Sequence, residues 1–298
     1  MIKNSEQAKL EREEVEKSEK LLSPKRDAVF HSLFRKGNER ITKALIQDIT
    51  QRKYKIINMD KNVILEDGVV DHKNEVLDLL VELDDGELCN VEIQLSNTTN
   101  FRERMLEYWA KLYSRQMEIG DKYTELKRTI IIAIVDFNIK DLKNEGYHTK
   151  WQIREENNHK LILTKHFELH IIEIEKAKKA LGKNKCDKIA QWMSFFDNPN
   201  STEVKSMSEK NEDINEAMKE LRRLSSNKEL VWRMYMEDRR ERDNQAILDF
   251  KIEEATKKVV RKAKKETKIA TKKALKDGKE QRNKRSCKEN ARKKHSNW

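Results

Sequence analysis

Two acidic residues lie on neighbouring runs of alternating apolar and polar residues, and their spacing suits divalent-cation chemistry. Asp78 lies within residues 75–83 and Glu92 lies within residues 87–95, with Asp84-Asp85-Gly86 between the runs. Two such runs joined by a short, glycine-containing turn are typical of a β-hairpin. Carboxylate oxygens are ligands that Mg²⁺ prefers, and the ion keeps positions for water and phosphate oxygens. The pattern therefore points to a metal-assisted reaction at a phosphate group.

The register of this hairpin decides whether the two acids meet. A two-residue loop would bury the apolar face of one strand and expose that of the other, so we reject it. A three-residue loop, residues 84–86, places a glycine where a left-handed residue is needed and pairs Leu83 with Glu87. Asp78 then lies opposite Glu92, with Cβ atoms about 5 Å apart. The alternative interpretation is that both acids belong to one solvated face of a two-sided sheet.

The surrounding sequence predicts an α/β domain over residues 22–200. Ser23 and Pro24 have the pattern of a helix N-cap and first helical residue, and a second amphipathic helix follows over residues 41–49. A short strand near residues 55–58, the hairpin, a helix over 99–118 and a buried β-branched strand over 129–137 come next. The helical crossover allows this last strand to lie parallel to the second hairpin strand. Two further strands are predicted near residues 149–154 and 168–174.

Several linked motifs of this chain are similar to those of one nuclease family. They are Leu22-Ser23-Pro24-Lys25-Arg26-Asp27-Ala28-Val29-Phe30, Leu77-Asp78-Leu79, Asn90-Val91-Glu92-Ile93-Gln94-Leu95-Ser96, Phe101-Arg102-Glu103-Arg104 and Tyr108-Trp109-Ala110-Lys111-Leu112-Tyr113. In this order the chain resembles the Rpn family of recombination-promoting nucleases, also described as PD-(D/E)XK nuclease family transposases. The resemblance implies a restriction-endonuclease-like core, in which helices flank a mixed sheet, with a mostly helical C-terminal extension. It also implies a DNA endonuclease that depends on Mg²⁺ or Mn²⁺ and is linked to recombination or a mobile element.

The same resemblance suggests roles for individual residues. Asp78 matches the motif aspartate and Glu92 the second acid, and both are expected to bind the metal. Gln94 stands where other nucleases of this fold have lysine; it can orient a water or a phosphate but carries no positive charge. Lys111 or Arg104 on the following helix is a candidate for the missing cation, because seven residues separate them and both lie on one helical face. Lys111 can equally be a surface lysine.

The first helices of this fold often contribute a further acid, and Asp27 and Glu39 are candidates for it. Asp27 can equally be a first-turn acid that the helix dipole favours. The 7 histidines show no HExxH or other paired spacing, and we assign them no metal role. The 3 cysteines are far apart, which argues against disulfides and thiolate zinc sites, and Cys89 is expected to be a small core residue.

Charge divides the chain into segments. Residues 1–21 form a charged arm without an apolar stretch, so no signal peptide is expected. No apolar run in the sequence approaches the roughly 18 residues of a membrane span, and the cytoplasm is the default location. Residues 201–278 are predicted to be helical, and residues 279–298 to be a basic, disordered tail. Residues 251–298 contain 19 Lys and Arg against 6 Asp and Glu in a chain of net charge +11, so the basic surplus belongs to the C-terminal part. Such a segment favours polyanions such as DNA, or is a solvated lysine-rich helix.

Three functions remain open at this point. The first is a metal-dependent DNA endonuclease. The second is a catalytically inactive DNA-binding or regulatory protein on a nuclease fold, which would use the basic C-terminal segment. The third is an interaction protein that forms a homo-oligomer through helices over residues 203–277. The intact pair of acids favours the first.

Overall fold

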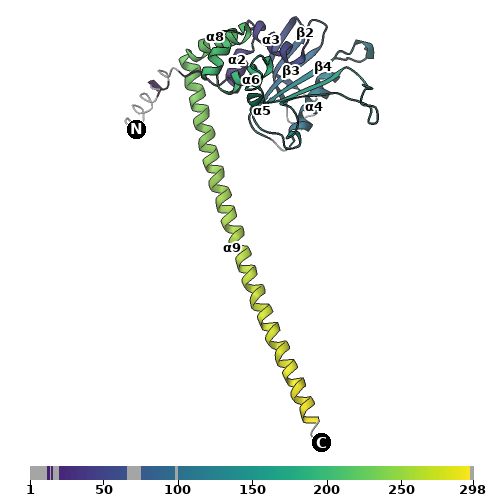
Figure 1. Cartoon of the computed structure of the whole chain (residues 1–298), viewed down its shortest axis with the longest axis vertical. Helices are drawn as coiled ribbons and strands as arrows, with labels where there is room; N and C mark the ends of the chain where they lie inside the picture. Colours follow the sequence, from purple (N-terminus) through teal and green to yellow (C-terminus); the bar gives the residue numbers. More distant parts are fainter. Residues whose placement is uncertain (1–11, 14, 16–19, 66–74, 98–99, 296–298) are drawn as a thin grey trace. The chain divides into compact units, whose positions relative to one another are not determined.

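A mixed six-stranded sheet is the centre of the first compact unit of the chain, Met1–Met234 (Figure 1). The computed structural model describes residues 12, 13, 15, 20–65, 75–97 and 100–295. The strands follow the order β1-β2-β3-β4-β6-β5 across the sheet. Their bounds are β1 Ile56–Leu65, β2 Glu75–Leu83, β3 Leu88–Gln94, β4 Thr129–Val135, β5 His148–Trp151 and β6 Phe167–Glu173.

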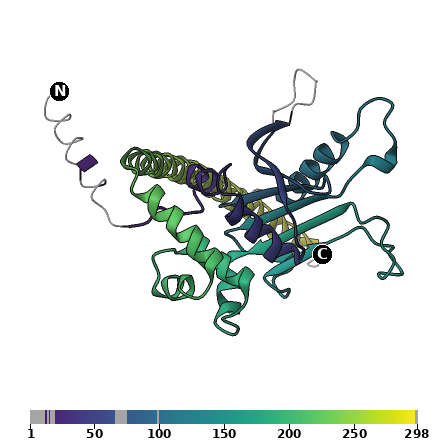
Figure 2. The same ribbon diagram turned by 90° about the horizontal axis from the view of Figure 1, so that it is seen from above.

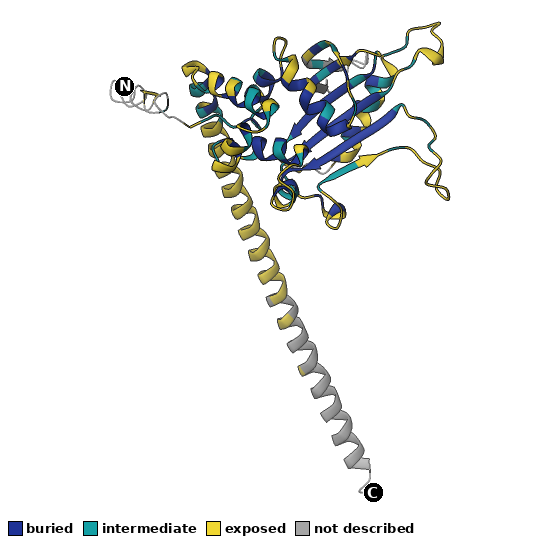
Figure 3. Cartoon of the chain, turned by 45° about the horizontal axis from the view of Figure 1, so that its top comes forward, coloured by how far each residue is buried: buried dark blue, intermediate teal, exposed yellow. Residues whose placement is uncertain are grey.

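The middle of the sheet is parallel, as the sequence predicts. Strand β4 lies parallel to both β3 and β6, and helix α4, Phe101–Ser114, forms the crossover between β3 and β4. Every residue of β4 and β6 is buried (Figure 3). Burial on both faces explains why the β4 sequence is a continuous β-branched run instead of an alternating one. The expected restriction-endonuclease-like core, a mixed sheet with flanking helices, is confirmed.

The hairpin register also agrees with the prediction. Strands β2 and β3 are antiparallel, and their pairing runs from Leu79 opposite Val91 to Glu82 opposite Leu88. The Leu83 amide donates to the Glu87 carbonyl at 2.9 Å, which closes the three-residue loop. Gly86 has a φ of 76°, the left-handed conformation that this loop requires. The regular pairing ends at Leu79 and Val91, and Asp78 and Glu92 are the next residues of the two strands.

Helices cover the two faces of the sheet unequally (Figures 1 and 2). Helix α4 packs on one face through Phe101, Met105 and Tyr108. The larger hydrophobic cluster includes side chains of α2 Asp27–Leu33, α3 Glu39–Thr50, α5 Ile174–Leu181, α6 Lys188–Asp197, α7 Thr202–Ser208 and α8 Glu212–Ser225. Two short 3₁₀ turns, Tyr123–Glu125 and Lys140–Leu142, flank β4. Cys89 is fully buried, as expected of a small core residue.

The first helix begins later than the sequence pattern indicates. Residues 23–26 form a turn in which the Arg26 amide donates to the Ser23 carbonyl at 3.1 Å, and α2 starts at Asp27. Proline suits the second position of such a turn as well as the first turn of a helix, so the pattern was ambiguous. The turn directs the Lys25 ammonium to Asp136 at 2.6 Å and to Asp197 at 3.3 Å. These ion pairs attach the start of α2 to the ends of β4 and α6.

The C-terminal helices divide differently from the predicted segments. The chain separates between Met234 and Tyr235, so α7 and α8 belong to the first unit. They do so because Val204, Met218 and Leu221 bury their side chains in the larger cluster. Helix α9 spans Lys228–His295, and Leu230 and Met234 at its start are also buried.

The second unit, Tyr235–Trp298, consists of the remainder of α9. The helix continues through residues 279–295, where the sequence predicts a disordered tail. Lysine, arginine, glutamate and glutamine all favour helix, so local propensity alone accounts for this difference. Self-association through the helices of residues 203–277 remains a prediction. No described helix is both long and apolar enough to span a bilayer.

Substitution of Phe196 tests how much its packing against α2 stabilises the fold. Its ring lies 6.2 Å from Phe30 and 5.9 Å from Phe34, centroid to centroid, and is fully buried. We expect Phe196→Ala to lower the free energy of unfolding by about 3–5 kcal/mol in chemical denaturation, because a cavity replaces the ring. Phe250→Ala is the matched control, since Phe250 is 62% exposed on α9. Equal effects of the two substitutions would contradict the packing described here.

Candidate metal centre

The β2–β3 hairpin ends its regular backbone pairing at the two predicted acids. An unbroken ladder would next join Ile93 to the backbone of Leu77. Instead, the Ile93 amide donates to Asp78 Oδ2 at 3.0 Å, and the Asp78 amide donates to Glu92 Oε1 at 3.1 Å. Each carboxylate thus accepts a hydrogen bond from the backbone of the opposite strand. These crossed bonds fix the two acids beside each other where the strands separate.

Burial makes this pair costly when both acids are ionised. Glu92 is 1% exposed, and burial followed by the negative charge of Asp78 raises the pKa of Glu92 to about 8. Burial also raises the pKa of Asp78. Among the residues that the structure describes, no lysine or arginine forms an ion pair with either acid. A neighbouring divalent cation would remove the repulsion and favour the charged forms.

Glu168, another buried acid of the same sheet, is neutralised by neighbouring basic side chains. Arg52 contacts both Glu168 carboxylate oxygens at 3.1 and 2.9 Å, and Lys150 contacts one of them at 3.1 Å. Burial alone would raise the pKa of Glu168, but a hydrogen bond from His170 and the charge of Arg52 lower it overall. Glu168 is therefore a structural acid with its own counter-charges. Among the described residues no lysine or arginine pairs directly with Asp78 or Glu92; the charge of Arg104 acts on Glu92 through Gln94 and is too weak to offset burial. This distinguishes the two acids as a candidate site for an external cation.

Polar side chains continue from Glu92 towards helix α4. The Asn90 amide donates to Glu92 Oε1 at 2.9 Å, and the Gln94 amide donates to Glu92 Oε2 at 3.3 Å. Arg104, in the first turns of α4, donates to Gln94 Oε1. Gln94 therefore connects the guanidinium of Arg104 to the carboxylate of Glu92. The order of these contacts places a positive charge behind a neutral amide.

The other candidate cation lies further along α4. Lys111 forms an ion pair with Glu107 at 3.1 Å. The neighbouring Trp109 donates to the Thr129 carbonyl at 3.1 Å, at the start of β4, whereas Glu92 lies opposite Ala133 near its end. Of the two predicted cations, Arg104 is therefore the one with a described contact to the acids, through Gln94.

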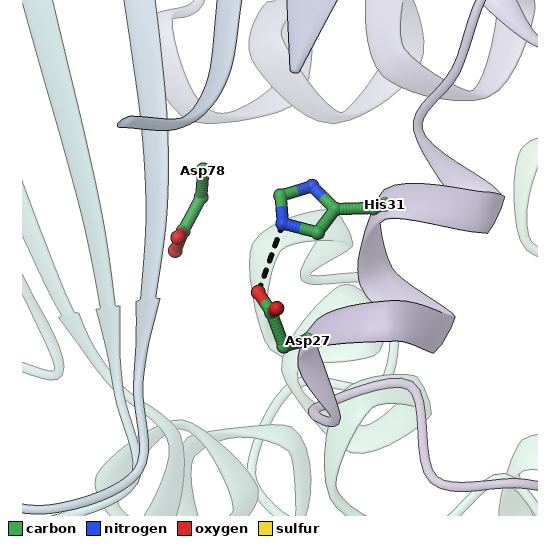
Figure 4. A group of neighbouring side chains, drawn as sticks. All are labelled: Asp27, His31 and Asp78. Carbon is green, nitrogen blue, oxygen red and sulfur yellow. Dashed lines mark ion pairs between the residues drawn. The ribbon is translucent and has the colours of Figure 1, made fainter. Parts of the chain in front are cut away.

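Helix α2 supplies two more groups at the same place (Figure 4). Ligand atoms of Asp27, His31 and Asp78 all lie within 4.8 Å of one another. Asp27 Oδ1 is 2.9 Å from His31 Nε2, and this contact lowers the pKa of Asp27. The side chain of Asp27 is 75% exposed, so solvent reaches the group from this side. Glu39, the other candidate, instead accepts a hydrogen bond from the Gly37 amide at 2.8 Å.

Comparison with known families identifies the chain. The profile of the family described as PD-(D/E)XK nuclease family transposase matches residues 24–251. The chain belongs to this family. Comparison with curated proteins and with solved structures gave no match. The match includes α2, the hairpin and α4, and so contains every residue described in this site.

Membership in the PD-(D/E)XK family supports a nuclease or transposase-like function, as the sequence predicts. Nucleases of this family generally use divalent metals, and the acidic and histidine side chains described above suit such an ion. Sequence reasoning did not single out His31. The signal available was its spacing of four residues from Asp27, which places both side chains on one face of a helix.

The acid pair predicts an unusual pH dependence for the stability of the metal-free protein. The pKa of Glu92 is raised from 4.5 to about 8, so its stabilising contribution is fully present below about pH 4.5 and is lost as the pH rises through about 8. Glu92→Gln removes this loss. In chemical denaturation with chelator present, Glu92→Gln should be more stable than the parent at pH 9, and this difference should shrink towards pH 5.

Glu82→Gln is the control for this experiment, because it makes the same change at an exposed position of the same hairpin. A stability difference for Glu92→Gln that does not vary with pH would contradict the assignment. Addition of Mg²⁺ at pH 9 should stabilise the parent more than Glu92→Gln, since an ion that binds the folded state shifts the folding equilibrium.

Proposed function

We propose that this protein is a DNA endonuclease that hydrolyses phosphodiester bonds with Mg²⁺ or Mn²⁺ and acts in recombination or for a mobile element. The observation that carries the proposal is the close pair of the partly buried Asp78 and the buried Glu92, held side by side by crossed backbone bonds and without a direct ion pair to a described lysine or arginine. Family membership supplies the reaction class. DNA as the substrate and the identity of the metal are parts of the proposal.

The donor set fits such an ion. Carboxylate oxygens of Asp78 and Glu92 are hard ligands, and one oxygen of each acid is oriented by the opposite strand. When bound, a divalent cation lowers the pKa of a coordinated water and stabilises charge that develops on a phosphate. Asp27 lies on the exposed side of the group, where a phosphodiester and solvent can approach. The residues present therefore meet the requirements of the chemistry.

The remaining side chains have distinct tasks in this proposal. Asp78 and Glu92 hold the cation, and their mutual repulsion falls when it binds. Gln94 donates and accepts through its amide, so it can orient the attacking water or a phosphate oxygen. Arg104 contacts Gln94 and supplies the positive charge that lysine provides in other nucleases of this fold. Hydrolysis then adds water across one P–O bond, and the leaving oxygen departs as the other end of the broken strand.

The inactive DNA-binding alternative is favoured by one observation, the basic surplus of residues 251–298. Exposed lysines along α9 would bind DNA by releasing counterions, with affinity that falls steeply as salt rises. This alternative requires binding but no cleavage. The two proposals are therefore separated by activity and not by affinity.

Plasmid nicking tests the endonuclease. With Mg²⁺, the parent protein should convert supercoiled DNA to open circles, and Asp78→Asn should reduce the rate by at least about 10²-fold, because the cation loses an essential ligand. Glu82→Gln, exposed on the same strand, should keep the parent rate. Equal nicking by the parent and Asp78→Asn would indicate a contaminating nuclease. Salt-dependent binding without nicking by the parent would support the inactive alternative.

The two candidate cations can be separated by substitution. Arg104→Gln should slow nicking by about 10–100-fold, because the positively charged guanidinium that contacts Gln94 is lost. Lys111→Gln should change the rate by less than about 3-fold, because the described ion pair of the partly buried Lys111 is with the half-exposed Glu107 and not with the acids. Arg102→Gln controls for loss of a guanidinium on α4, because Arg102 pairs with Asp141 at 3.0 Å. The reverse ranking would assign the role to Lys111.

A further inference from the structure

A buried histidine with unsatisfied nitrogens faces the acid group on the α2 side. His31 is 6% exposed, and neither of its ring nitrogens forms a hydrogen bond of ordinary geometry with any residue that the structure describes. A buried polar atom without such a partner costs about 1–3 kcal/mol. Hydrophobic packing alone therefore does not explain why the ring nitrogens of His31 are buried without such a hydrogen bond.

The direction of its side chain suggests what is missing (Figure 4). His31 points from α2 towards Asp78, and its Nε2 lies 2.9 Å from Asp27 Oδ1 without the alignment of a hydrogen bond. Two ligands of one octahedral ion, each about 2.1 Å from it, lie about 3 Å apart when they are adjacent. A nitrogen and an oxygen that are close but not aimed at each other fit this arrangement. Their lone pairs can then converge on a common centre.

We propose that Asp27, His31 and Asp78 form a binding site for a divalent transition-metal ion, with one imidazole nitrogen and two carboxylate oxygens as protein ligands. Their ligand atoms lie within 4.8 Å of one another, so a small movement brings them around one ion. Asp27 can make this movement because its side chain is 75% exposed. Asp78 also belongs to the acid pair with Glu92, so the two positions share one carboxylate.

The chemistry of the ligands predicts which ions bind. Carboxylates and water suit Mg²⁺, whereas imidazole suits later ions of the first transition row. A site that contains His31 should therefore prefer Mn²⁺, and still more Co²⁺ or Ni²⁺, over Mg²⁺, following the general order of affinities along that row. The acid pair alone would give a weaker preference, because the imidazole nitrogen is the ligand that most favours these ions over Mg²⁺. The inference thus concerns the metal selectivity of the proposed nuclease, but binding can be measured without any DNA.

Pulsed electron paramagnetic resonance with Mn²⁺ tests the site in the full chain. The echo of bound Mn²⁺ should show modulation from a directly coordinated imidazole ¹⁴N, and ¹⁵N-labelling of histidine should change its frequencies. His31→Gln should abolish this modulation and weaken Mn²⁺ binding by about 10-fold or more, with a smaller loss for Mg²⁺. His159→Gln is the matched control, because His159 is exposed on a loop and the substitution is the same.

Two further variants keep the test decisive. His31→Phe preserves an aromatic ring next to Phe30 if glutamine disturbs the fold, and it should also lose the imidazole modulation while keeping the parent's circular dichroism. Glu92→Gln should lose DNA cleavage but retain the ¹⁴N signal, so failure of the nuclease proposal is distinguishable from failure of this one. Modulation that persists in both His31 variants, or is absent from the parent at saturating Mn²⁺, would overturn the proposal.

Discussion

The candidate site depends on the close approach of two carboxylates, the buried Glu92 and the partly buried Asp78, which repel each other when both are ionised. The antiparallel register brings Asp78 and Glu92 together, and the crossed bonds from the Ile93 and Asp78 amides keep them there. The arrangement is unfavourable when both acids are ionised, and a bound cation would offset that cost. Glu168, on the same sheet, is a buried acid that forms ion pairs with Arg52 and Lys150, so it does not require an external cation.

The rest of the first unit holds this hairpin and the groups around it. The buried parallel strands β4 and β6 support β3 from one side, and α4 positions Arg104 where β3 ends. On the other face, α2 is attached by the aromatic rings around Phe196 and by the ion pairs of Lys25. Both attachments place Asp27 and His31 close to Asp78, where the regular pairing of β2 with β3 ends. The site is therefore assembled from three segments of the chain that are distant in sequence.

Charge is distributed between the two units in a manner that suits a protein acting on a polyanion. The acids lie in the sheet of the first unit, whereas the basic surplus lies in residues 251–298 of the second. A cation at the acids would be needed before a phosphodiester could approach them, because like charges repel. Attraction along α9 requires no such ion and decreases with salt. Under the proposed function, affinity for DNA and competence for cleavage would thus belong to different parts of the chain.

The sequence by itself determined the hairpin, its register and the meeting of Asp78 with Glu92. This was possible because alternation of side chains and the three-residue loop with Gly86 act over fewer than 20 residues, and a register shift of one would expose the core. The tertiary structure decided how the helices dock. Only long-range packing could choose Asp27 over Glu39, bring Arg104 to Gln94, and turn His31 towards the acids, since each depends on where a whole helix lies against the sheet. Local patterns cannot contain that information, because the partners of these side chains are far away in sequence and become neighbours through burial of the common core.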